Sequence, residues 1–381
     1  MKLIKNVKVY TPSYIGKKDV LFDEKIIAIN DHIDPSPHLD VIDGSNKMMI
    51  PGLIDNHIHI TGGGGEAGYQ SKVPPLTLEM FVKGGITTAI GLLGTDGFTR
   101  SMKELITKAK ALKGEGLSVY ALSGSYQVPL KTLFDSLEDD MLLIEEIIGA
   151  GEIAISDHRS ASPTLVELKK ILSSVHVGGL LSSKGGVMNV HVGSGKEKID
   201  LLKRLASETE YPVQKIIPTH MNRNEALVKE GFDYIQTYGG VIDLTAYFDE
   251  NNPLNAHRVF KQAIDEGIDF NRITISSDGG GSLPKFDEEK NFIKMGVGSV
   301  EALINTLKQG VNECQIPLET MLLPISKNVA KFYHLKHKGE IKKRFDADLI
   351  LLDQALNITD VFMKGNVMLK AKQVIQKGMF E

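Results

Sequence analysis

Several features are scarce in this chain, and each scarcity excludes a class of protein. Cys314 is the one cysteine among 381 residues, which excludes an intrachain disulfide and a thiolate-rich zinc site and fits a reducing compartment. No apolar run approaches the roughly 20 residues of a membrane-spanning helix, and the first ten residues interleave charges with apolar positions, unlike a secretion signal. The 44 basic and 48 acidic residues form no basic cluster. We therefore expect a cytoplasmic protein with a small-molecule partner, and neither nucleic acid nor a membrane as partner.

Both ends of the chain carry a pattern that predicts β-strands. Apolar residues alternate through residues 3–9, and short apolar runs at 19–22 and 25–29 flank an Asp-Glu turn. Similar runs return at 346–353 and 361–369, the second with a Lys-Gly-Asn turn. We expect residues 1–50 and 340–381 to form one small, discontinuous β-sandwich domain, because short isolated sheets are marginal in water. Two independent flaps are the alternative.

Between these ends, apolar β-branched runs alternate with amphipathic stretches of helical period. Eight such units predict an α/β fold, a (β/α)8 TIM barrel over residues 51–339, with its active site at the carboxyl ends of the strands; an open doubly wound sheet is the alternative. The predicted strands are Leu53–Ile60, Thr87–Leu93, Ser118–Ser123, Glu152–Ser156, Val187–Val192, Lys215–Thr219, Val241–Ala246 and Arg272–Ser277. The predicted helices are Thr99–Leu112, Glu138–Ile148, Thr164–Leu172, Glu197–Leu205, Ala256–Ile264 and Val300–Val311.

Metal-competent side chains lie on or beside these predicted strands. His57 and His59 are two positions apart on the first strand, so their imidazoles point to one face and can share a cation. Taken singly, most of the candidates could be packing or turn residues. Together, four histidines and two carboxylates predict a two-metal site with the nitrogen and oxygen ligands that zinc accepts. The predicted ligands are His57, His59, Glu152, His191, His220 and Asp278.

The order of these ligands resembles that of the amidohydrolase superfamily of metal-dependent hydrolases, and the likeness spans nearly the whole chain. A narrower likeness, to the isoaspartyl (β-aspartyl) dipeptidases, rests on five stretches in order, at residues 62–68, 94–96, 156–160, 219–224 and 278–282. This resemblance implies a metallopeptidase that hydrolyses β-aspartyl dipeptides. It also implies a homo-oligomer, for which the family suggests an octamer.

One position departs from that family. Its best-known members have a carbamylated lysine on the fourth barrel strand, where this chain has Glu152. A carbamate and a carboxylate are both monoanions with two oxygens, so Glu152 is expected to bridge two Zn²⁺ ions, although its shorter reach requires the metals or the strand to shift inward. The alternative is a site in which Glu152 binds one metal and the second is weak or absent.

The resemblance also implies the catalytic groups. A hydroxide held between the metals would attack the amide carbonyl, while Asp278 takes up its proton and then passes it to the departing amine. Tyr126 would help to stabilise the oxyanion, and a packing role for this tyrosine is the alternative.

Substrate binding calls for groups that complement a zwitterionic dipeptide, namely a carboxylate for its free α-amine and arginines for its carboxylates. Glu66, Arg159 and Arg223 can supply these groups, although Arg159 could instead serve as an ion-pair partner of Asp157. Glycine before Glu66 lets the backbone approach a ligand closely. The family pattern adds three further binding residues, which are Gly64, Thr95 and Ser282.

Two other functions stay open on the sequence alone. A dihydroorotase- or hydantoinase-like hydrolase of cyclic amides would share the metal ligands, but it would leave Glu66 and the two arginines without a purpose. A catalytically silent barrel protein would not need Asp278 together with all four histidines.

Overall fold

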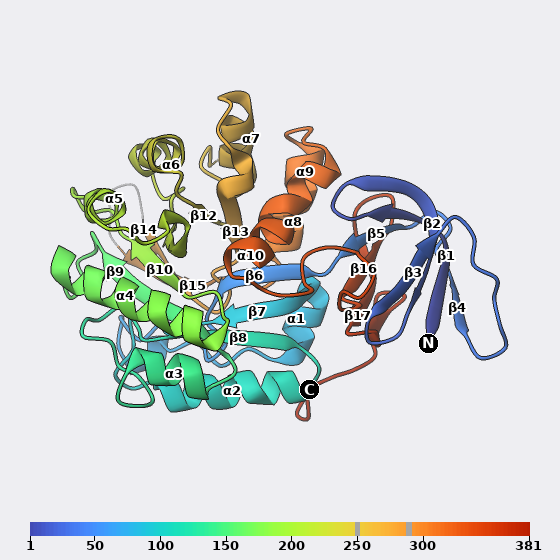
Figure 1. Ribbon diagram of the computed structural model, residues 1–381, viewed down its shortest axis with the longest axis horizontal. Coiled ribbons are helices and arrows are strands. Elements are labelled where there is room, and N and C mark those ends of the chain that lie inside the picture. Colours follow the sequence, from blue (N-terminus) through green and yellow to red (C-terminus); the bar gives the residue numbers. More distant parts are fainter. Residues whose placement is uncertain (248–251, 287–291) are drawn as a thin grey trace.

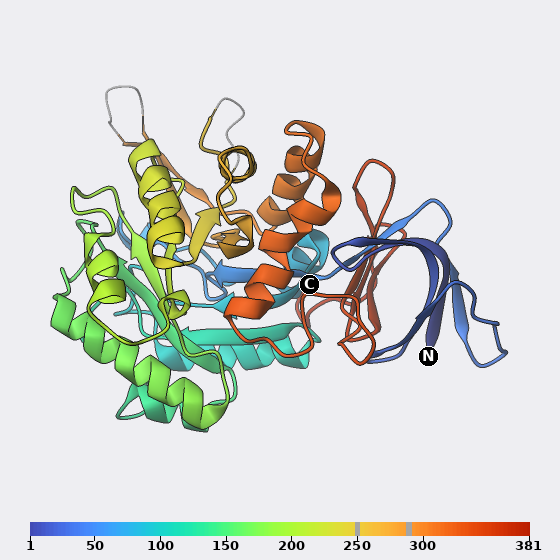
Figure 2. The same ribbon diagram turned by 45° about the horizontal axis from the view of Figure 1, so that its top comes forward.

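The computed structural model describes residues 1–247, 252–286 and 292–381, and it has two lobes side by side (Figures 1 and 2). One lobe is a ring of parallel strands with helices outside it, and the other is a curved sheet with strands from both ends of the chain. Among the described residues, no helix is both long and apolar enough to cross a membrane.

Eight buried parallel strands form the ring. Six of them hydrogen-bond in the order β11-β10-β9-β8-β7-β6, and the other two, β12 and β13, pair with each other. All eight were predicted, because each is a run of mainly apolar and β-branched residues, and all are buried except for the partly exposed Tyr120 of β8. The strands are β6 (Leu53–Ile58), β7 (Ile86–Gly91), β8 (Ser118–Ser123), β9 (Ile147–Ile155), β10 (Val187–Val192), β11 (Ile216–Thr219), β12 (Ile242–Thr245) and β13 (Ile273–Ser276).

Backbone contacts join these two groups of strands. Met221 N–H donates to Asp243 O at 3.1 Å, which links the end of β11 to β12. Ile58 of β6 forms a parallel bridge with Gly279, just after β13, and the adjacent His59 N–H donates to Gly279 O at 2.8 Å. The sheet therefore closes on itself, and the predicted (β/α)8 barrel is confirmed.

Helices cover the outside of the barrel, as alternating strands and helices require. Ser101 and Thr164 cap α2 and α4, the latter through a capping box with Glu167. The helices are α1 (Leu78–Gly84), α2 (Met102–Gly114), α3 (Leu137–Leu143), α4 (Leu165–Ser182), α5 (Asp200–Ser207), α6 (Glu225–Tyr238), α7 (Ala256–Asp265), α8 (Ala302–Asn312), α9 (Leu318–Leu322) and α10 (Lys327–Phe332), with 3-10 turns η1 (Tyr69–Ser71), η2 (Val213–Lys215), η3 (Phe270–Arg272) and η4 (Leu323–Ile325).

Several predicted element boundaries were wrong. The helix predicted over Glu138–Ile148 ends at Leu143, because Ile147 and Ile148 begin β9 and the β-branched pair fits the pleated sheet. The first barrel strand ends at Ile58 instead of Ile60, so His59 follows the strand. The helix α6 was not predicted, nor was the hairpin of β14 (Ser282–Phe286) and β15 (Phe292–Val297).

Strands from both ends of the chain build the second sheet. Its nine strands run in the order β19-β18-β17-β16-β5-β1-β2-β3, with β4 beside β1. Phe22 of β2 packs edge-on against Phe362 of β17, with ring centroids 5.3 Å apart, although the two strands are not neighbours in the sheet. The strands are β1 (Lys2–Tyr10), β2 (Tyr14–Phe22), β3 (Ile26–Asn30), β4 (Asp40–Asp43), β5 (Met48–Pro51), β16 (Leu349–Leu352), β17 (Ile358–Met363), β18 (Asn366–Lys370) and β19 (Gln373–Val374).

This sheet adjoins the barrel through a buried cation. Lys338 Nζ donates to Ser118 Oγ of β8 at 2.7 Å, lies 2.9 Å from Asp346 and also binds Asp348. The division of the chain into domains at residues 50 and 340 stays a prediction.

Candidate metal centre and active site

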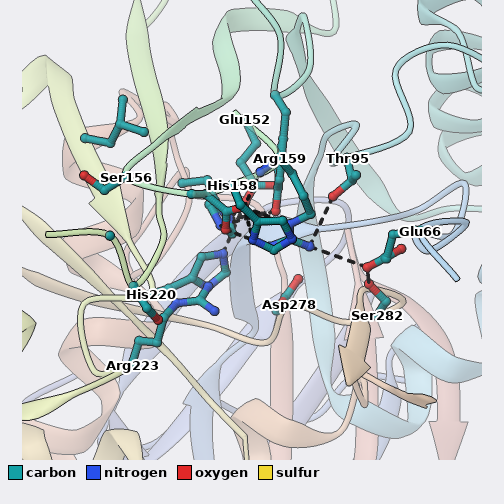
Figure 3. A pocket seen from close by; sticks show the side chains of 18 of the residues that line it. Glu66, Thr95, Glu152, Ser156, His158, Arg159, His220, Arg223, Asp278 and Ser282 are labelled. Carbon is teal, nitrogen blue, oxygen red and sulfur yellow. Dashed lines mark hydrogen bonds and ion pairs between the residues drawn. The ribbon is translucent and has the colours of Figure 1, made fainter. Parts of the chain in front are cut away.

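The six predicted metal ligands converge at the carboxyl ends of the barrel strands. Five of them line a cavity of about 1380 Å³ (Figure 3), and the sixth, His57, is fully buried beside them. The six are His57 in β6, His59 just after β6, Glu152 in β9, His191 in β10, His220 just after β11 and Asp278 two residues after β13.

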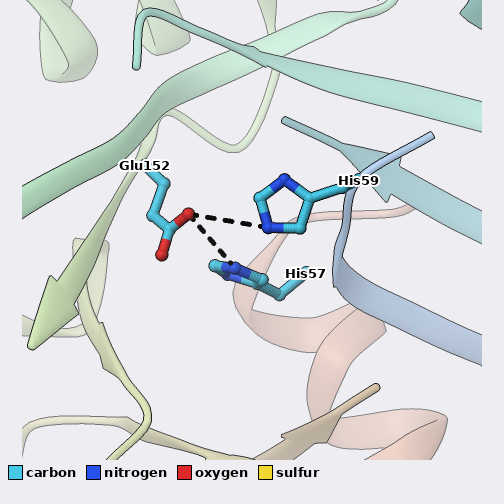
Figure 4. A group of neighbouring side chains, drawn as sticks. All are labelled: His57, His59 and Glu152. Atoms are coloured by element: carbon cyan, nitrogen blue, oxygen red, sulfur yellow. Dashed lines mark ion pairs between the residues drawn. The ribbon is translucent and has the colours of Figure 1, made fainter. Parts of the chain in front are cut away.

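Glu152 lies between two pairs of histidines. Its Oε2 is 3.4 Å from His57 Nε2 and 3.9 Å from His59 Nε2 (Figure 4). Its Oε1 is 2.7 Å from His191 Nδ1 and 3.2 Å from His220 Nε2. Within each of the two resulting groups, the candidate ligand atoms all lie within 4.8 Å of one another. One carboxylate is therefore common to two candidate cation positions.

Atoms at this centre lack the partners that buried polar groups normally have. Both ring nitrogens of His57, Nδ1 of His59 and Oε2 of Glu152 are buried without a hydrogen bond to any described residue. Gly94 borders the same space, because a Cβ there would lie 2.8 Å from His59 Cε1 and 3.6 Å from Glu152 Oε2. Imidazole and carboxylate groups around such a space fit a divalent metal ion.

The central carboxylate governs the electrostatics of the cluster. Burial would raise the pKa of Glu152, but the imidazoles of His57 and His191 hold this pKa well below its usual range. Burial would lower the pKa of His57, and the charge of Glu152 raises it to about 9. Burial lowers the pKa of His220 to about 3. At neutral pH, Glu152 is therefore an ionised candidate ligand, and a cation at His57 would compete with a proton.

Asp278 lies at the boundary between the metal centre and the cavity. Its Oδ1 is 3.1 Å from His59 Nε2, and its backbone N–H donates to His57 O at 3.1 Å. Burial would raise the pKa of Asp278, but the hydrogen bond with His59 and the charge of His220 lower it, so the carboxylate is ionised and can accept a proton. Asp278 and His220 have φ angles of 51° and 64°, a strained left-handed conformation that is common at functional sites.

The second ring nitrogens of two histidines are also bound. His191 Nε2 lies 2.9 Å from Asp157 Oδ2, and His220 Nδ1 lies 2.7 Å from Thr245 Oγ1. Metal-binding histidines usually have such a partner on the nitrogen that does not face the metal. The Tyr126 hydroxyl lies in the cavity wall, 2.8 Å from His191 Nδ1, and burial raises its pKa, so it remains a hydrogen-bond donor.

Four of the predicted substrate-binding residues form one network in the cavity wall. Ser282 donates a hydrogen bond to Glu66 Oε1, and Arg159 Nη1 lies 3.5 Å from the same oxygen. Arg159 Nη1 also donates to Thr95 Oγ1 at 3.3 Å. Gly64 lines the cavity beside them with a φ of 80°, and a Cβ there would lie 2.3 Å from Ser71 O, so this position requires glycine.

The two arginines differ in their partners. Arg159 forms the ion pair with Asp157 that the sequence allowed, through Nε to Oδ1 at 2.9 Å and Nη2 to Oδ2 at 2.8 Å, and it also lines the cavity. Arg223 donates from Nε to Val192 O at 3.1 Å and has no ion-pair partner among the described side chains. Figure 3 shows Arg223 and Glu66 on opposite sides of Asp278.

Two buried carboxylates close to the ligands were not predicted from the sequence. Asp55, two residues before His57, accepts hydrogen bonds from the backbone and hydroxyl of Ser277, and burial raises its pKa to about 7. Asp243 of β12 accepts from Asn56 Nδ2 at 2.8 Å and from three hydroxyl groups. The available signal was a charged residue inside a run that otherwise predicts a buried strand.

Comparisons with known proteins agree with this geometry. Residues 48–368 match the Amidohydrolase family. A β-aspartyl dipeptidase of Fervidobacterium islandicum AW-1, solved in complex with β-Asp-Leu dipeptide, is 43% identical, with 98% of this chain and 97% of that chain covered and a TM-score of 0.93. Another structure of a β-aspartyl dipeptidase from the same organism is 40% identical, covers 98% of both chains and has a TM-score of 0.90.

A dihydroorotase of Staphylococcus aureus (strain MRSA252) is 36% identical over 96 residues. That match takes in 25% of this chain and spans 22% of the length of the dihydroorotase. The likeness to isoaspartyl dipeptidases that the sequence stretches indicated is confirmed by the two solved structures, and the chain belongs to the amidohydrolase family.

Proposed function

We propose that this chain is a metallopeptidase that hydrolyses β-aspartyl dipeptides and works with two bound zinc ions. The observation that carries the proposal is the position of Glu152, which is shared by two histidine pairs directly beside a cavity wall of complementary charges.

The chemistry of the ligands supports zinc. Buried imidazoles and carboxylates are typical zinc ligands, and a carboxylate with two histidines on each oxygen is suited to bridge a metal pair. When bound, such a pair acidifies water and polarises the carbonyl of the amide that is cleaved. Glu152 supplies the negative charge that the carbamylated lysine supplies in the best-known members of the family.

Asp278 has the properties of a proton carrier. Its carboxylate is ionised and lines the cavity, so it can accept a proton from the attacking water and give it to the departing amine. Tyr126, which also faces the cavity and keeps its proton, can donate a hydrogen bond to the oxygen of the tetrahedral intermediate.

The cavity wall complements a β-aspartyl dipeptide. Glu66 can bind the free α-amine, with Ser282 already on one of its oxygens. Arg223 lacks an ion-pair partner among the described side chains, so it can bind a carboxylate with its guanidinium, and Arg159 offers Nη1 beside Thr95.

The test is hydrolysis of β-Asp-Leu and α-Asp-Leu by the purified protein, with zinc counted in the same sample. β-Selective turnover with about two zinc ions per chain is the expected result. Two zinc ions without turnover would contradict the substrate class, and one zinc ion or none would contradict the bridging role of Glu152.

A cyclic-amide hydrolase is the second candidate, favoured by the partial match to a dihydroorotase. Dihydroorotate and hydantoin should be assayed beside the dipeptides. If either ring is hydrolysed faster than β-Asp-Leu, the proposed substrate class is wrong. We expect slower hydrolysis of a neutral ring such as hydantoin, because it has no amine for Glu66 to bind. A catalytically silent barrel would bind zinc and turn over none of these compounds.

Three further expectations remain proposals: a cytoplasmic location, the division into residues 1–50 plus 340–381 and 51–339, and a homo-oligomer that the family resemblance suggests is an octamer. Exposed leucines on α3 and α4 support an oligomer, because apolar side chains gathered on a surface are typical of protein interfaces. Light scattering on the purified protein would measure the oligomeric state. The leucines are Leu142, Leu143, Leu180 and Leu181.

A further inference from the structure

Asp157 contacts both the metal side and the substrate side of the site. It follows β9, which carries Glu152, and its side chain is 6% exposed. Its Oδ2 lies 2.9 Å from His191 Nε2 and 2.8 Å from Arg159 Nη2. Its Oδ1 accepts from Nε and from the backbone N–H of Arg159, each at 2.9 Å. One carboxylate thus binds a candidate metal ligand and a candidate substrate-binding arginine.

On the metal side, this contact supports the form of His191 that can bind a metal. Both ring nitrogens face a carboxylate, because Nε2 lies 2.9 Å from Asp157 Oδ2 and Nδ1 lies 2.7 Å from Glu152 Oε1. A cation held by Nδ1 and Glu152 would leave the single N–H of a neutral imidazole on Nε2, where Asp157 can accept it. His220 Nε2 is 3.2 Å from the same Glu152 oxygen. Asp157 therefore stabilises the form of His191 in which Nδ1 can bind a cation together with His220.

On the substrate side, Asp157 occupies two of the three guanidinium nitrogens of Arg159. Because Nε and Nη2 face Asp157, Nη1 is the nitrogen that reaches Thr95 Oγ1 at 3.3 Å and Glu66 Oε1 at 3.5 Å. The ring of Tyr126 lies 5.3 Å from the centre of the guanidinium. Without its two side-chain hydrogen bonds to Asp157, the long Arg159 side chain would regain its rotamer freedom.

We propose that Asp157 is a positioning residue that sets His191 for metal binding and Arg159 for substrate binding at the same time. The substrate half of this inference rests on the proposed function, and the metal half rests on the side-chain contacts. Asp157 acts through these two neighbours. Removal of its charge should therefore weaken metal binding and substrate binding together, whereas a residue that serves Arg159 alone would change only substrate binding.

The first experiment compares Asp157→Asn with the wild type in two assays. Asparagine keeps the shape but has no charge, and its NH2 group would face the two N–H donors on whichever oxygen it replaces. In competition with a chromophoric chelator, we expect zinc affinity to fall about 10- to 100-fold, the usual effect of losing the partner of a ligating histidine. With β-Asp-Leu, we expect KM to rise about tenfold or more while the thermal melting of the zinc-loaded protein is retained.

Matched variants separate the two halves. Asp265→Asn removes a carboxylate from an exposed pair on α7 and should change neither value. In an Arg159→Met background, Asp157→Asn should still lower zinc affinity about tenfold, but it should not raise KM further, because the arginine that it positions is gone. A fall in zinc affinity alone, a rise in KM alone, or neither would overturn the shared role.

A measurement on the wild type remains decisive if Asp157→Asn does not fold. In ¹⁵N-histidine NMR spectra of the zinc-loaded protein, His191 should carry its proton on Nε2, and a proton on Nδ1 would overturn the proposal. The chelator and NMR assays need no substrate. If the wild type does not hydrolyse β-Asp-Leu, the proposed function fails, while these two assays still decide whether Asp157 positions His191.

Discussion

Glu152 Oε2 lies 3.4 Å from His57 Nε2, and neither atom has a hydrogen-bond partner in the part of the chain that the structure describes. Burial would lower the pKa of His57, but the charge of Glu152 raises it to about 9, so a proton on His57 and a divalent cation compete for the same place beside this carboxylate. Buried polar atoms without a hydrogen bond are rare in folded proteins, and a divalent cation would be a partner for both. The short distance from Glu152 to His57 therefore supports a metal-binding role for Glu152, the residue that replaces the carbamylated lysine of the family.

The first prediction concerns the charge of Glu152. Glu152→Gln keeps the size of the side chain and removes the anion that two cations would share, so zinc content should fall below two per chain and turnover should fall by at least about 100-fold. Metal analysis and β-Asp-Leu assays on the same preparation measure both. Glu145→Gln changes a glutamate whose side chain is 80% exposed and should change neither value.

Bicarbonate provides a further check on Glu152. No carbamate has to form on a glutamate, so added bicarbonate should leave the activity of the wild type unchanged. A strong bicarbonate requirement would contradict the role of Glu152 as a direct ligand.

The second prediction concerns Asp278. In Asp278→Asn the side chain can no longer accept the proton of the attacking water, so kcat for β-Asp-Leu should fall by about 10²- to 10⁴-fold. Zinc should stay bound, because the histidines and Glu152 remain. Initial rates and zinc analysis measure the two effects, with Asp265→Asn as the control. Retained turnover would remove Asp278 as the proton carrier.

The barrel and the convergence of the candidate metal ligands could be predicted because the relevant signal is local. Each barrel strand is a mainly apolar or β-branched run, and parallel strands bring their carboxyl ends together, so His191 and His220 were placed in one site before any contact was known. The boundary between α3 and β9 could not be predicted, because apolar periodicity alone does not tell whether Ile147 and Ile148 end a helix or begin a buried strand.

The network behind the ligands was beyond sequence reasoning. Asp157 lay in a stretch that carried the family resemblance, and its ion pair with Arg159 two residues away was considered from the sequence, but its contact with His191 joins two different strand ends. Likewise, the hydrogen bond from Asn56 to Asp243 joins two strands, β6 and β12, that are far apart in the sequence. Such contacts depend on tertiary placement, which neither apolar periodicity nor motif spacing encodes.

The third prediction concerns Arg223. Arg223→Met keeps an unbranched apolar stem and removes a guanidinium with no ion-pair partner among the described side chains. KM for β-Asp-Leu should therefore rise by about tenfold or more, with little change in stability. Steady-state kinetics and a thermal melt separate the two effects. Arg204→Met, which removes an exposed i,i+4 pair with Glu208, is the control. An unchanged KM would place Arg223 outside the substrate pocket.

The fourth prediction concerns Lys338, which binds the barrel and the nine-stranded sheet at one buried point. Lys338→Met leaves Asp348 without its cation and leaves Asp346 with Lys25 alone, at 3.3 Å. Removing one partner of a buried pair lowers the free energy of unfolding by about 3–5 kcal/mol. Urea unfolding monitored by circular dichroism measures the loss. Lys336→Met, at an exposed position two residues away, should behave as the wild type.

The stability difference between wild type and Lys338→Met should also depend on pH. Burial would raise the pKa of Asp346, but Lys338 lowers it, so this carboxylate stabilises the fold above its unfolded pKa of about 3.9, and the contribution is lost as pH falls through the lower folded value. Burial would lower the pKa of Lys338, but its two carboxylates raise it, so the lysine contributes below about pH 10.4. The difference should thus be constant near neutral pH and shrink in acid. A difference that persists undiminished below about pH 3 would show that lost packing, and not lost charge pairing, destabilises the variant.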